Sequence, residues 1–253
     1  MQDEYNLDNH KLMFHPERVT QWLRSHDNWE SAKSLYPIYV EISPTGACNH
    51  RCTFCALDYV GYNNVSLNKD LLKERLDEMK RLGIKSIMFG GEGEPTLWGP
   101  LPETIEHCVN IGIDASLTTN MVLFTHKNTG CFLKNCSWIK TSINAGTAET
   151  YSKIHKTRQE DFDCVMDNFR ECVEERRKNG YACTIGAQML LLPENAHEAV
   201  ILGNKLKDIG IDYLVIKPYS QHLYSVTRTY EDIDYQPYLK LEKELQDLTG
   251  DNF

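Results

Sequence analysis

The sequence predicts an α/β fold, a partial (β/α)6 TIM-like barrel with an N-terminal helical extension. Four amphipathic runs end in glycine, each with a short apolar segment following within two residues, at Gly83, Gly112, Gly180 and Gly210. Glycine often ends helices, and near-continuous apolar strands are typical of parallel sheets covered on both faces. Six such strands are too few for the closed eight-stranded barrel, so right-handed crossovers should curl the sheet into an open one. A doubly wound sheet is the alternative on strand pattern alone.

The expected strands are short and apolar, and helices separate most of them. In chain order the strands are Tyr36–Ile42, Ser86–Phe89, Asp114–Leu117, Trp138–Ile143, Cys183–Leu190 and Tyr213–Ile216. The expected helices are Lys69–Leu82, Pro102–Asn110, Ala148–Lys153, Phe162–Lys178 and Ala196–Ile209. The first of these helices repeats apolar residues at helical spacing, which indicates one buried face.

One barrel domain, residues 36–253, is expected, because 253 residues with 41% hydrophobic content suit a single sizeable core. Residues 1–35 are predicted to form the extension, with a helix near Pro16–Arg24. Residues 235–248 are predicted to form a C-terminal helix, with several leucines available for packing.

Composition limits the partners and the compartment. A formal net charge of −9 argues against a nucleic-acid partner, because such affinity depends on clustered basic side chains. The polar, acidic start and the lack of a long apolar run predict a cytoplasmic protein without a membrane partner. Nine cysteines, an odd number, lie mostly in predicted helices and strands, so a disulfide framework is not expected.

Three cysteines follow the first expected strand at C-x3-C-x2-C spacing: Cys48, Cys52 and Cys55. Three thiolates this close together can hold a metal cluster and leave it one ligand short. A zinc site would need a second pair, and Cys131 with Cys136 fits zinc-ribbon spacing poorly. Iron–sulfur clusters are bound by such short cysteine runs. A zinc-binding module without turnover stays open as an alternative.

The cysteine spacing resembles that of the radical S-adenosylmethionine (SAM) superfamily. The resemblance implies that the three cysteines hold a 4Fe–4S cluster and that SAM chelates the fourth iron through its amino and carboxylate groups. One electron from the cluster would then cleave SAM to methionine and a 5'-deoxyadenosyl radical that takes hydrogen from a substrate. Phe54 matches a family position that packs near the adenine, although it equally suits an anchor into the core.

A second motif, GGEGEP, follows the second expected strand. It resembles the family's glycine-rich SAM motif, which implies that Gly91, Gly93 and Glu94 bind the amino group of SAM. The usual form reads Gly-Gly-Glu-Pro, so the extra Glu92 makes the assignment of the carboxylate ambiguous.

Polar side chains at the carboxyl ends of other expected strands are further candidates, because parallel barrels gather their chemistry there. The resemblance implies SAM ribose or carboxylate contacts for Ser142, Asn144 and Gln188, and we rank Ser142 and Asn144 above Thr119. Each is also an ordinary turn or cap residue. Candidates for substrate contact are Tyr59, Asn120, Lys217, Tyr219, Gln221 and His222. A solvated loop is the alternative for the last four, and His126 and His155 are expected to be bystanders.

The whole-chain pattern is similar to radical SAM proteins of sugar, surface-polysaccharide or natural-product biosynthesis. The implied substrate is a small polar molecule, such as a nucleotide-sugar or related polyol, and the implied reductant is a flavodoxin or ferredoxin. A peptide-modifying enzyme, an epimerase or cross-linking enzyme, is the rival. No cysteine follows Cys183, so a C-terminal domain with auxiliary clusters is either absent by nature or lies beyond the end of this sequence.

Overall fold

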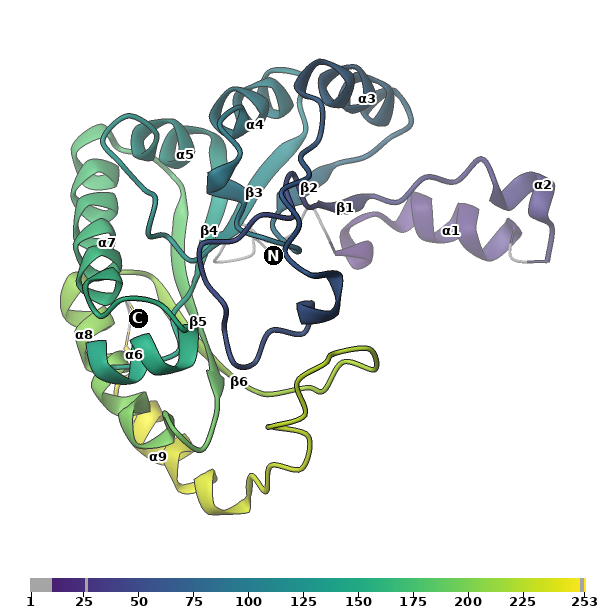
Figure 1. The fold of residues 1–253 in the computed structure, drawn as a ribbon. Helices are drawn as coiled ribbons and strands as arrows, with labels where there is room; N and C mark the ends of the chain where they lie inside the picture. Colours follow the sequence, from purple (N-terminus) through teal and green to yellow (C-terminus); the bar gives the residue numbers. More distant parts are fainter. Residues whose placement is uncertain (1–10, 26, 251–252) are drawn as a thin grey trace.

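The computed structural model describes residues 11–25, 27–250 and 253. Its centre is one sheet of six parallel strands that lie in sequential order (Figure 1). The strands are β1 Tyr39–Ile42, β2 Ser86–Phe89, β3 Asp114–Thr119, β4 Cys136–Ser142, β5 Thr184–Leu191 and β6 Tyr213–Pro218. This order confirms the predicted partial barrel, since a doubly wound sheet reverses its strand order in the middle.

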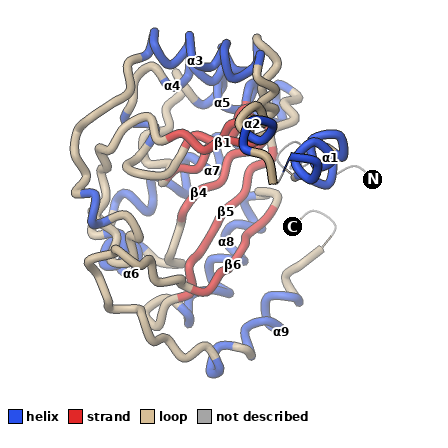
Figure 2. Tube along the Cα trace, turned by 90° about the vertical axis from the view of Figure 1, so that its right-hand side faces the viewer, coloured by secondary structure: helices blue, strands red, loops and turns tan. Residues whose placement is uncertain are grey.

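Five helices cover one face of the sheet, and each packs on the next along the row (Figure 1). They are α3 Lys69–Arg81, α4 Leu101–Asn110, α5 Thr129–Asn135, α7 Glu160–Asn179 and α8 Ala199–Ile209. The strands lie side by side at the centre of Figure 2. Because these helices line the outside, the opposite face of the sheet is the concave interior of the barrel.

The core lies between the sheet and these outer helices. Ile87, Phe89, Ile139 and Ile185 are fully buried there, in one cluster with helix residues such as Leu76. Side chains alternate along a strand, so their neighbours in sequence point into the barrel. Burial of each large apolar side chain contributes roughly 1.5 to 3 kcal/mol, and the core thereby fixes which residues face the interior.

The four glycines predicted to end helices all have positive φ. The angles are 95° at Gly83, 78° at Gly112, 65° at Gly180 and 87° at Gly210. Residues with a Cβ rarely adopt this left-handed conformation, so glycine ends each helix sharply and turns the chain into the next strand. The prediction that these four glycines each end a helix before a strand is therefore confirmed.

Some elements differ from the prediction. β1 begins at Tyr39 rather than Tyr36, consistent with the missing N–H of Pro37. Helix α5 was not predicted, because it is short and contains Gly130. Phe132 and Leu133 of α5 are almost fully buried, so tertiary packing stabilises this helix despite its weak local signal.

The two ends of the chain carry shorter helices. α1 (Pro16–Ser25) and α2 (Trp29–Ala32) project from the barrel (Figure 1). The expected C-terminal helix is reduced to a 3-10 turn, η6 (Gln236–Tyr238), and α9 (Lys240–Gln246). Leu241 is the buried residue of α9, so packing supports a shorter helix than the leucine spacing predicts. In the described part of the chain, no helix is long and apolar enough to cross a membrane.

Helix α6 (Ala148–His155) begins soon after β4 and is held by a buried carboxylate. Glu198, at the end of the turn η5 (Ala196–Glu198), accepts hydrogen bonds from the backbone N–H groups of Gly146 (2.7 Å) and Thr147 (3.1 Å). The hydroxyls of Thr147 and Thr150 also donate to it. Burial favours the neutral acid, but these hydrogen bonds outweigh burial and hold the pKa of Glu198 below its ordinary value of 4.5.

We expect Glu198→Gln to lower the free energy of unfolding at pH 7 by about 1 to 3 kcal/mol, because an amide cannot accept from all these donors. A lowered pKa stabilises the folded state above the unfolded pKa, and this stabilisation is lost as pH falls through the folded pKa. The difference between Glu198→Gln and the parent should therefore shrink below pH 4.5. Urea unfolding at pH 7 and in acid measures it, with the exposed Glu149→Gln as control. A difference that grows in acid would contradict the assignment.

Candidate active site

The cysteine loop follows β1 and is tied to the protein on two sides. On one side the N–H of Glu94 donates to the carbonyl of Ala47 at 2.7 Å, which joins the loop to the glycine motif. On the other side Arg51 and Thr53 donate from their N–H groups to the last two carbonyls of α6, at 3.1 and 2.8 Å. The cysteines are therefore held between the end of β2 and the end of α6, at the carboxyl edge of the sheet.

The three thiols of Cys48, Cys52 and Cys55 lie together in this loop and are half-buried. Burial raises the pKa of the Cys48 thiol, and it raises that of Cys52 well above the ordinary value. The other two thiols raise the pKa of Cys52 further, because a second and third negative charge nearby are unfavourable. A bound cation removes both penalties, since it deprotonates coordinating thiols outright. The donor set therefore fits a thiolate-bound cluster.

The second cysteine pair needed for a zinc-ribbon site is not at this loop. Cys136 begins β4, at the amino end of the sheet, and Cys131 lies on α5, where its thiol donates to the carbonyl of Pro102 on α4. Cys48, Cys52 and Cys55 lie at the carboxyl end. The remaining cysteines occupy α4, α7 and the residue before β5, so within the described residues no fourth thiol joins the three.

The glycine motif lies against the cysteine loop. Gly91 and Gly93 have positive φ, 88° and 70°. A Cβ on Gly93 would lie 2.4 Å from the carbonyl oxygens of Ala47 and Thr45, so only glycine permits this contact between the loops. Gly91, Glu92 and Gly93 line a small hollow of about 60 Å³ with Cys48 and Cys55, among other residues. The structure thus brings together the two motifs that the sequence analysis singled out.

Glu94 is buried within a network of its own, with 3% of its surface exposed. Its carboxylate accepts from the N–H and hydroxyl of Thr96, the hydroxyl of Thr119 (2.6 Å) and the N–H of Asn120 (2.7 Å). Burial raises the pKa of Glu94, and the hydrogen bonds oppose that rise. The side chain of Glu92 is exposed. Glu94 therefore braces the glycine loop against β3, a role that the motif alone did not predict.

The other predicted SAM contacts separate into two groups. Ser142 and Gln188 lie opposite each other on β4 and β5, on the concave face. The side chain of Asn144 instead accepts from the N–H of Leu190 at 2.7 Å and so joins β4 to β5. Phe54 packs against a small apolar cluster that contains Ile154, and its contact with the adenine stays a prediction.

The segment after β6 folds against the cysteine loop (Figure 1). The carboxylate of Asp58 accepts from the N–H groups of Val226 (2.7 Å) and Thr227 (2.8 Å). Tyr59 stacks on His222, with ring centroids 5.2 Å apart. Two predicted substrate residues from distant parts of the chain therefore meet at the rim of the site.

The remaining substrate candidates have different surroundings. The hydroxyl of Tyr219 donates to Gln221 at 3.1 Å, within the same segment. Asn120 is buried and donates to the side chain of Asn49 at 2.7 Å, which ties β3 to the cysteine loop. Lys217 is exposed on β6. The side chain of Asn120 thus already makes an internal hydrogen bond, whereas that of Lys217 is accessible to a ligand.

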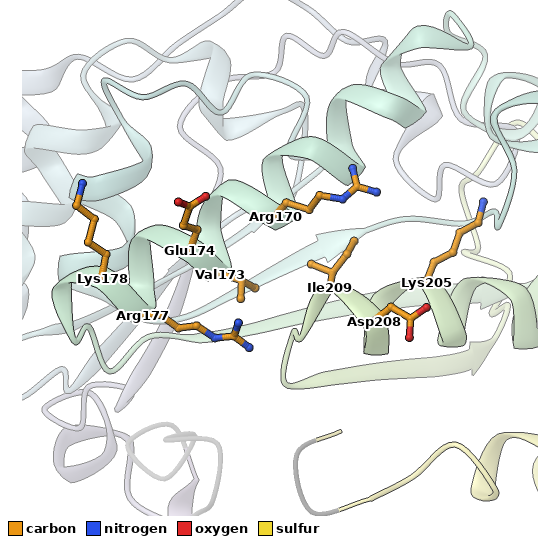
Figure 3. Close-up of a pocket in the computed structure, with 8 residues that line it drawn as sticks. All are labelled: Arg170, Val173, Glu174, Arg177, Lys178, Lys205, Asp208 and Ile209. Atoms are coloured by element: carbon orange, nitrogen blue, oxygen red, sulfur yellow. The ribbon is translucent and has the colours of Figure 1, made fainter.

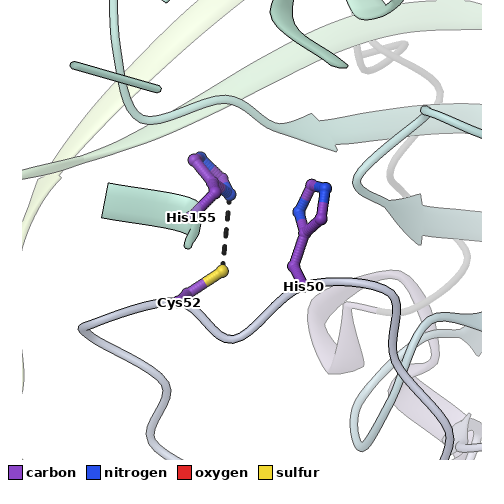
Figure 4. A group of neighbouring side chains, drawn as sticks. All are labelled: His50, Cys52 and His155. Carbon is purple, nitrogen blue, oxygen red and sulfur yellow. Dashed lines mark hydrogen bonds between the residues drawn. The ribbon is translucent and has the colours of Figure 1, made fainter. Parts of the chain in front are cut away.

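Two histidines at the site were missed by the sequence analysis. Nδ1 of His155 lies 3.4 Å from Sγ of Cys52, and His50 lies beside both (Figure 4). Burial lowers the pKa of His50 to about 4 and lowers that of His155 well below the ordinary value. His155, expected to be a bystander, therefore lies in direct contact with the cysteine loop. His126 is exposed and pairs with Glu171, away from the cysteine loop.

A larger hollow of about 690 Å³ lies between α7 and α8 (Figure 3). Its lining is mainly charged and includes Arg170, Arg177 and Lys205. It opens on the helix-covered side of the sheet and contains none of the predicted site residues. The candidate site is therefore the smaller hollow at the carboxyl ends of the strands.

An open parallel barrel that gathers three thiols and a glycine loop at the carboxyl ends of its strands has the architecture of a cluster-binding barrel enzyme. A family model described as the radical SAM superfamily matches residues 42–202. The chain belongs to this superfamily, whose enzymes use a 4Fe–4S cluster and SAM.

Curated relatives include a probable GTP 3',8-cyclase of Saccharolobus islandicus (strain M.14.25 / Kamchatka #1), 30% identical over 136 residues, which are 53% of this chain and 43% of the relative. The GTP 3',8-cyclase of Chlorobaculum tepidum is 29% identical over 148 residues, 54% of this chain and 44% of the relative. The chain thus spans less than half the length of these relatives.

Among solved structures, Streptococcus suis SuiB bound to its precursor peptide SuiA superposes with a TM-score of 0.70 at 18% identity. The match covers 93% of this chain and 50% of SuiB. The anSMEcpe protein with bound AdoMet gives a TM-score of 0.60 at 20% identity, over 83% of this chain and 60% of that one. At these identities the likeness shows the shared fold.

Proposed function

We propose that the chain acts as a radical SAM enzyme in which Cys48, Cys52 and Cys55 hold the 4Fe–4S cluster. The observation that carries this proposal is the common hollow formed by the cysteine loop and the glycine loop. When bound, the cluster and SAM supply a 5'-deoxyadenosyl radical that removes a hydrogen atom from the substrate. The three thiolates would fix the cluster, and the backbone of Gly91 and Gly93 would receive the amino group of SAM.

The cluster assignment is tested by anaerobic reconstitution with iron and sulfide. We expect about four iron and four sulfide per chain, and an EPR signal of the reduced protein that changes when SAM is added. One tightly bound zinc ion, with no iron taken up, would contradict the proposal. A flavodoxin or ferredoxin is the proposed reductant, and dithionite can replace it in the test.

The rest of the concave face would hold SAM and orient the substrate. We assign Ser142 and Gln188 to the ribose or carboxylate of SAM, because they lie side by side on that face. Tyr59 and His222 would close one side of the substrate cavity with their stacked rings. A wall of this kind would keep water from one side of the bound substrate, which would protect a reactive intermediate.

Two lysines on the concave face favour a negatively charged substrate. Lys140 alternates with the core residue Ile139 and so points into the barrel, where its ammonium lies 5.5 Å from the Trp138 ring centroid. Lys217 alternates with Ile216, which packs on the core. Burial and the nearby charge of Lys217 lower the pKa of Lys140, which Glu41 partly opposes. Among the described residues, no carboxylate lies within ion-pair distance of either lysine, so an anionic group would relieve their repulsion.

The substrate we propose is therefore a small polar molecule with a phosphate or carboxylate group, such as a nucleotide-sugar. The relatives named GTP 3',8-cyclase point in the same direction, because GTP is a nucleotide. A peptide is the second candidate. The exposed apolar side chains of Leu223, Tyr224 and Val226 near the rim favour it, as does the fold shared with SuiB.

The lysine pair is tested with the reconstituted, SAM-loaded protein. We expect UDP-glucose or GTP to bind more tightly than uridine, and Lys140→Ala to weaken that binding about tenfold to a hundredfold, because a charge-assisted hydrogen bond is lost. Calorimetry measures the affinity, and Lys69→Ala on the outer helix α3 serves as control. Equal affinity of Lys140→Ala and the parent for the nucleotides would contradict an anionic substrate at these lysines.

A further inference from the structure

His155 is the last residue of α6, and its ring reaches the middle cysteine of the loop (Figure 4). Nδ1 lies 3.4 Å from Sγ of Cys52, within hydrogen-bond distance for sulfur. The backbone fixes this approach, because the N–H groups of Arg51 and Thr53, on either side of Cys52, donate to the carbonyls of His155 and Ile154. The contact therefore belongs to the framework of the loop rather than to a mobile side chain.

The proton on the ring can be placed from its other partner. The backbone N–H of Asn144 points at Nε2 of His155, at 3.2 Å. A backbone N–H only donates, so Nε2 must be the accepting nitrogen. An imidazole ring keeps at least one N–H, so the hydrogen lies on Nδ1, the nitrogen that faces Cys52. His155 is thus a hydrogen-bond donor to the sulfur.

The ring has no room to turn away. His155 is 1% exposed and stacks on Tyr151 with ring centroids 4.1 Å apart. His50 and Phe54 contact it edge-on, at 5.3 and 5.8 Å. A side chain packed on three sides is held in one orientation, so the donor stays directed at Sγ.

We propose that His155 is a positioning residue that donates an Nδ1–H···S hydrogen bond to the Cys52 thiolate and thereby makes the cluster easier to reduce. The inference depends on the proposed cluster ligands. Hydrogen bonds to the sulfurs are one of the factors that set iron–sulfur potentials. Reduction adds negative charge to the cluster and its ligands, and a donor stabilises the more negative state. Loss of the donor should therefore lower the reduction potential.

The test is a redox titration of the reconstituted protein, followed by the EPR signal of the reduced cluster. For His155→Phe, which keeps a ring without a donor, we expect about a tenfold lower ratio of reduced to oxidised cluster at a fixed potential, equivalent to about 59 mV for one electron. His155→Asn places an amide near the Nδ1 position and should remain close to the parent. His50→Phe is the matched control, since the ring of His50 makes no hydrogen bond to a cysteine and its nearest charged neighbour is the Asp161 carboxylate, 3.7 Å from Nε2.

A His155→Phe midpoint equal to that of the parent, with about four iron per chain retained, would overturn the proposal. If His155→Phe does not retain the cluster, His155→Asn and His155→Gln decide, because only Asn places its amide near Nδ1. Equal midpoints for these two variants would also overturn it.

A parent protein that takes up no iron overturns the proposed function itself, which iron analysis recognises before any titration. The same analysis would detect a single ion held by His50, Cys52 and His155, whose ligand atoms lie within 4.8 Å of one another, and this too would overturn the proposal.

Discussion

Replacing any one of Cys48, Cys52 or Cys55 by alanine is expected to abolish reductive SAM cleavage. Three thiolates are the minimum that holds the cluster while leaving one iron for SAM, and within the described residues no other thiol lies at this loop to replace a lost one. Iron content should fall from about four per chain to less than one after reconstitution. Iron analysis and the yield of 5'-deoxyadenosine after reduction measure the two effects.

The matched control for these variants is Cys131→Ala. Cys131 is also partly buried, but it lies on α5, where its thiol donates to the carbonyl of Pro102 on α4. It should retain the iron content and the SAM cleavage of the parent. A variant at Cys48, Cys52 or Cys55 that keeps both would show that the ligand assignment is wrong.

Glu94→Gln is expected to have the second large effect, on the glycine loop and on SAM together. The carboxylate accepts from two backbone N–H groups and two hydroxyls, of Thr96, Thr119 and Asn120. An amide has one accepting oxygen, and its NH2 group would face one or more of these donors. The free energy of unfolding should therefore fall by about 1 to 3 kcal/mol. SAM affinity should fall about tenfold to a hundredfold, because the loop that receives its amino group loses its brace and its charge.

Glu92→Gln makes the same change of charge two residues away, on an exposed side chain. Urea unfolding and equilibrium binding of SAM to the reconstituted protein compare the two variants. We expect Glu92→Gln to match the parent in stability. Unchanged SAM affinity in Glu94→Gln together with weaker binding in Glu92→Gln would assign the amino group of SAM to Glu92.

The order of helices and strands could be predicted from the sequence because the patterns that mark them are local. Each glycine that ends a helix, such as Gly180 or Gly210, adopts the left-handed backbone that residues with a Cβ rarely adopt. Apolar strands and amphipathic helices repeat around these points, so the order of elements follows directly. Helix α5 had no such signal, since its stability comes from Phe132 and Leu133 in the core.

Parts of the site were predictable for the same reason. The cysteine spacing and the GGEGEP turn are short motifs, and the residues that define each motif are close together in the sequence. The contacts that hold them are not local. His155 with Cys52, Asn120 with Asn49 and Asp58 with residues 225–227 join segments far apart in sequence. No periodicity encodes such pairs, so the role of a single polar residue could not be predicted before the strands were placed.

Glu94 and Asn144 both make internal contacts that their predicted roles did not include. Glu94 was predicted as a cofactor contact from the glycine motif and Asn144 from its position after a strand, and both side chains are buried in hydrogen bonds to backbone. Buried polar groups need partners, and at a strand end the nearest partners are often the neighbouring loops. Their roles as SAM ligands stay predictions, which the binding measurements decide.

The most direct measurement of the central claim is the product of SAM after reduction. The reconstituted protein, kept free of oxygen and supplied with dithionite and SAM, should form 5'-deoxyadenosine and methionine, and Cys52→Ala should form neither. A parent protein that holds about four iron, binds SAM and still yields no 5'-deoxyadenosine would contradict the account.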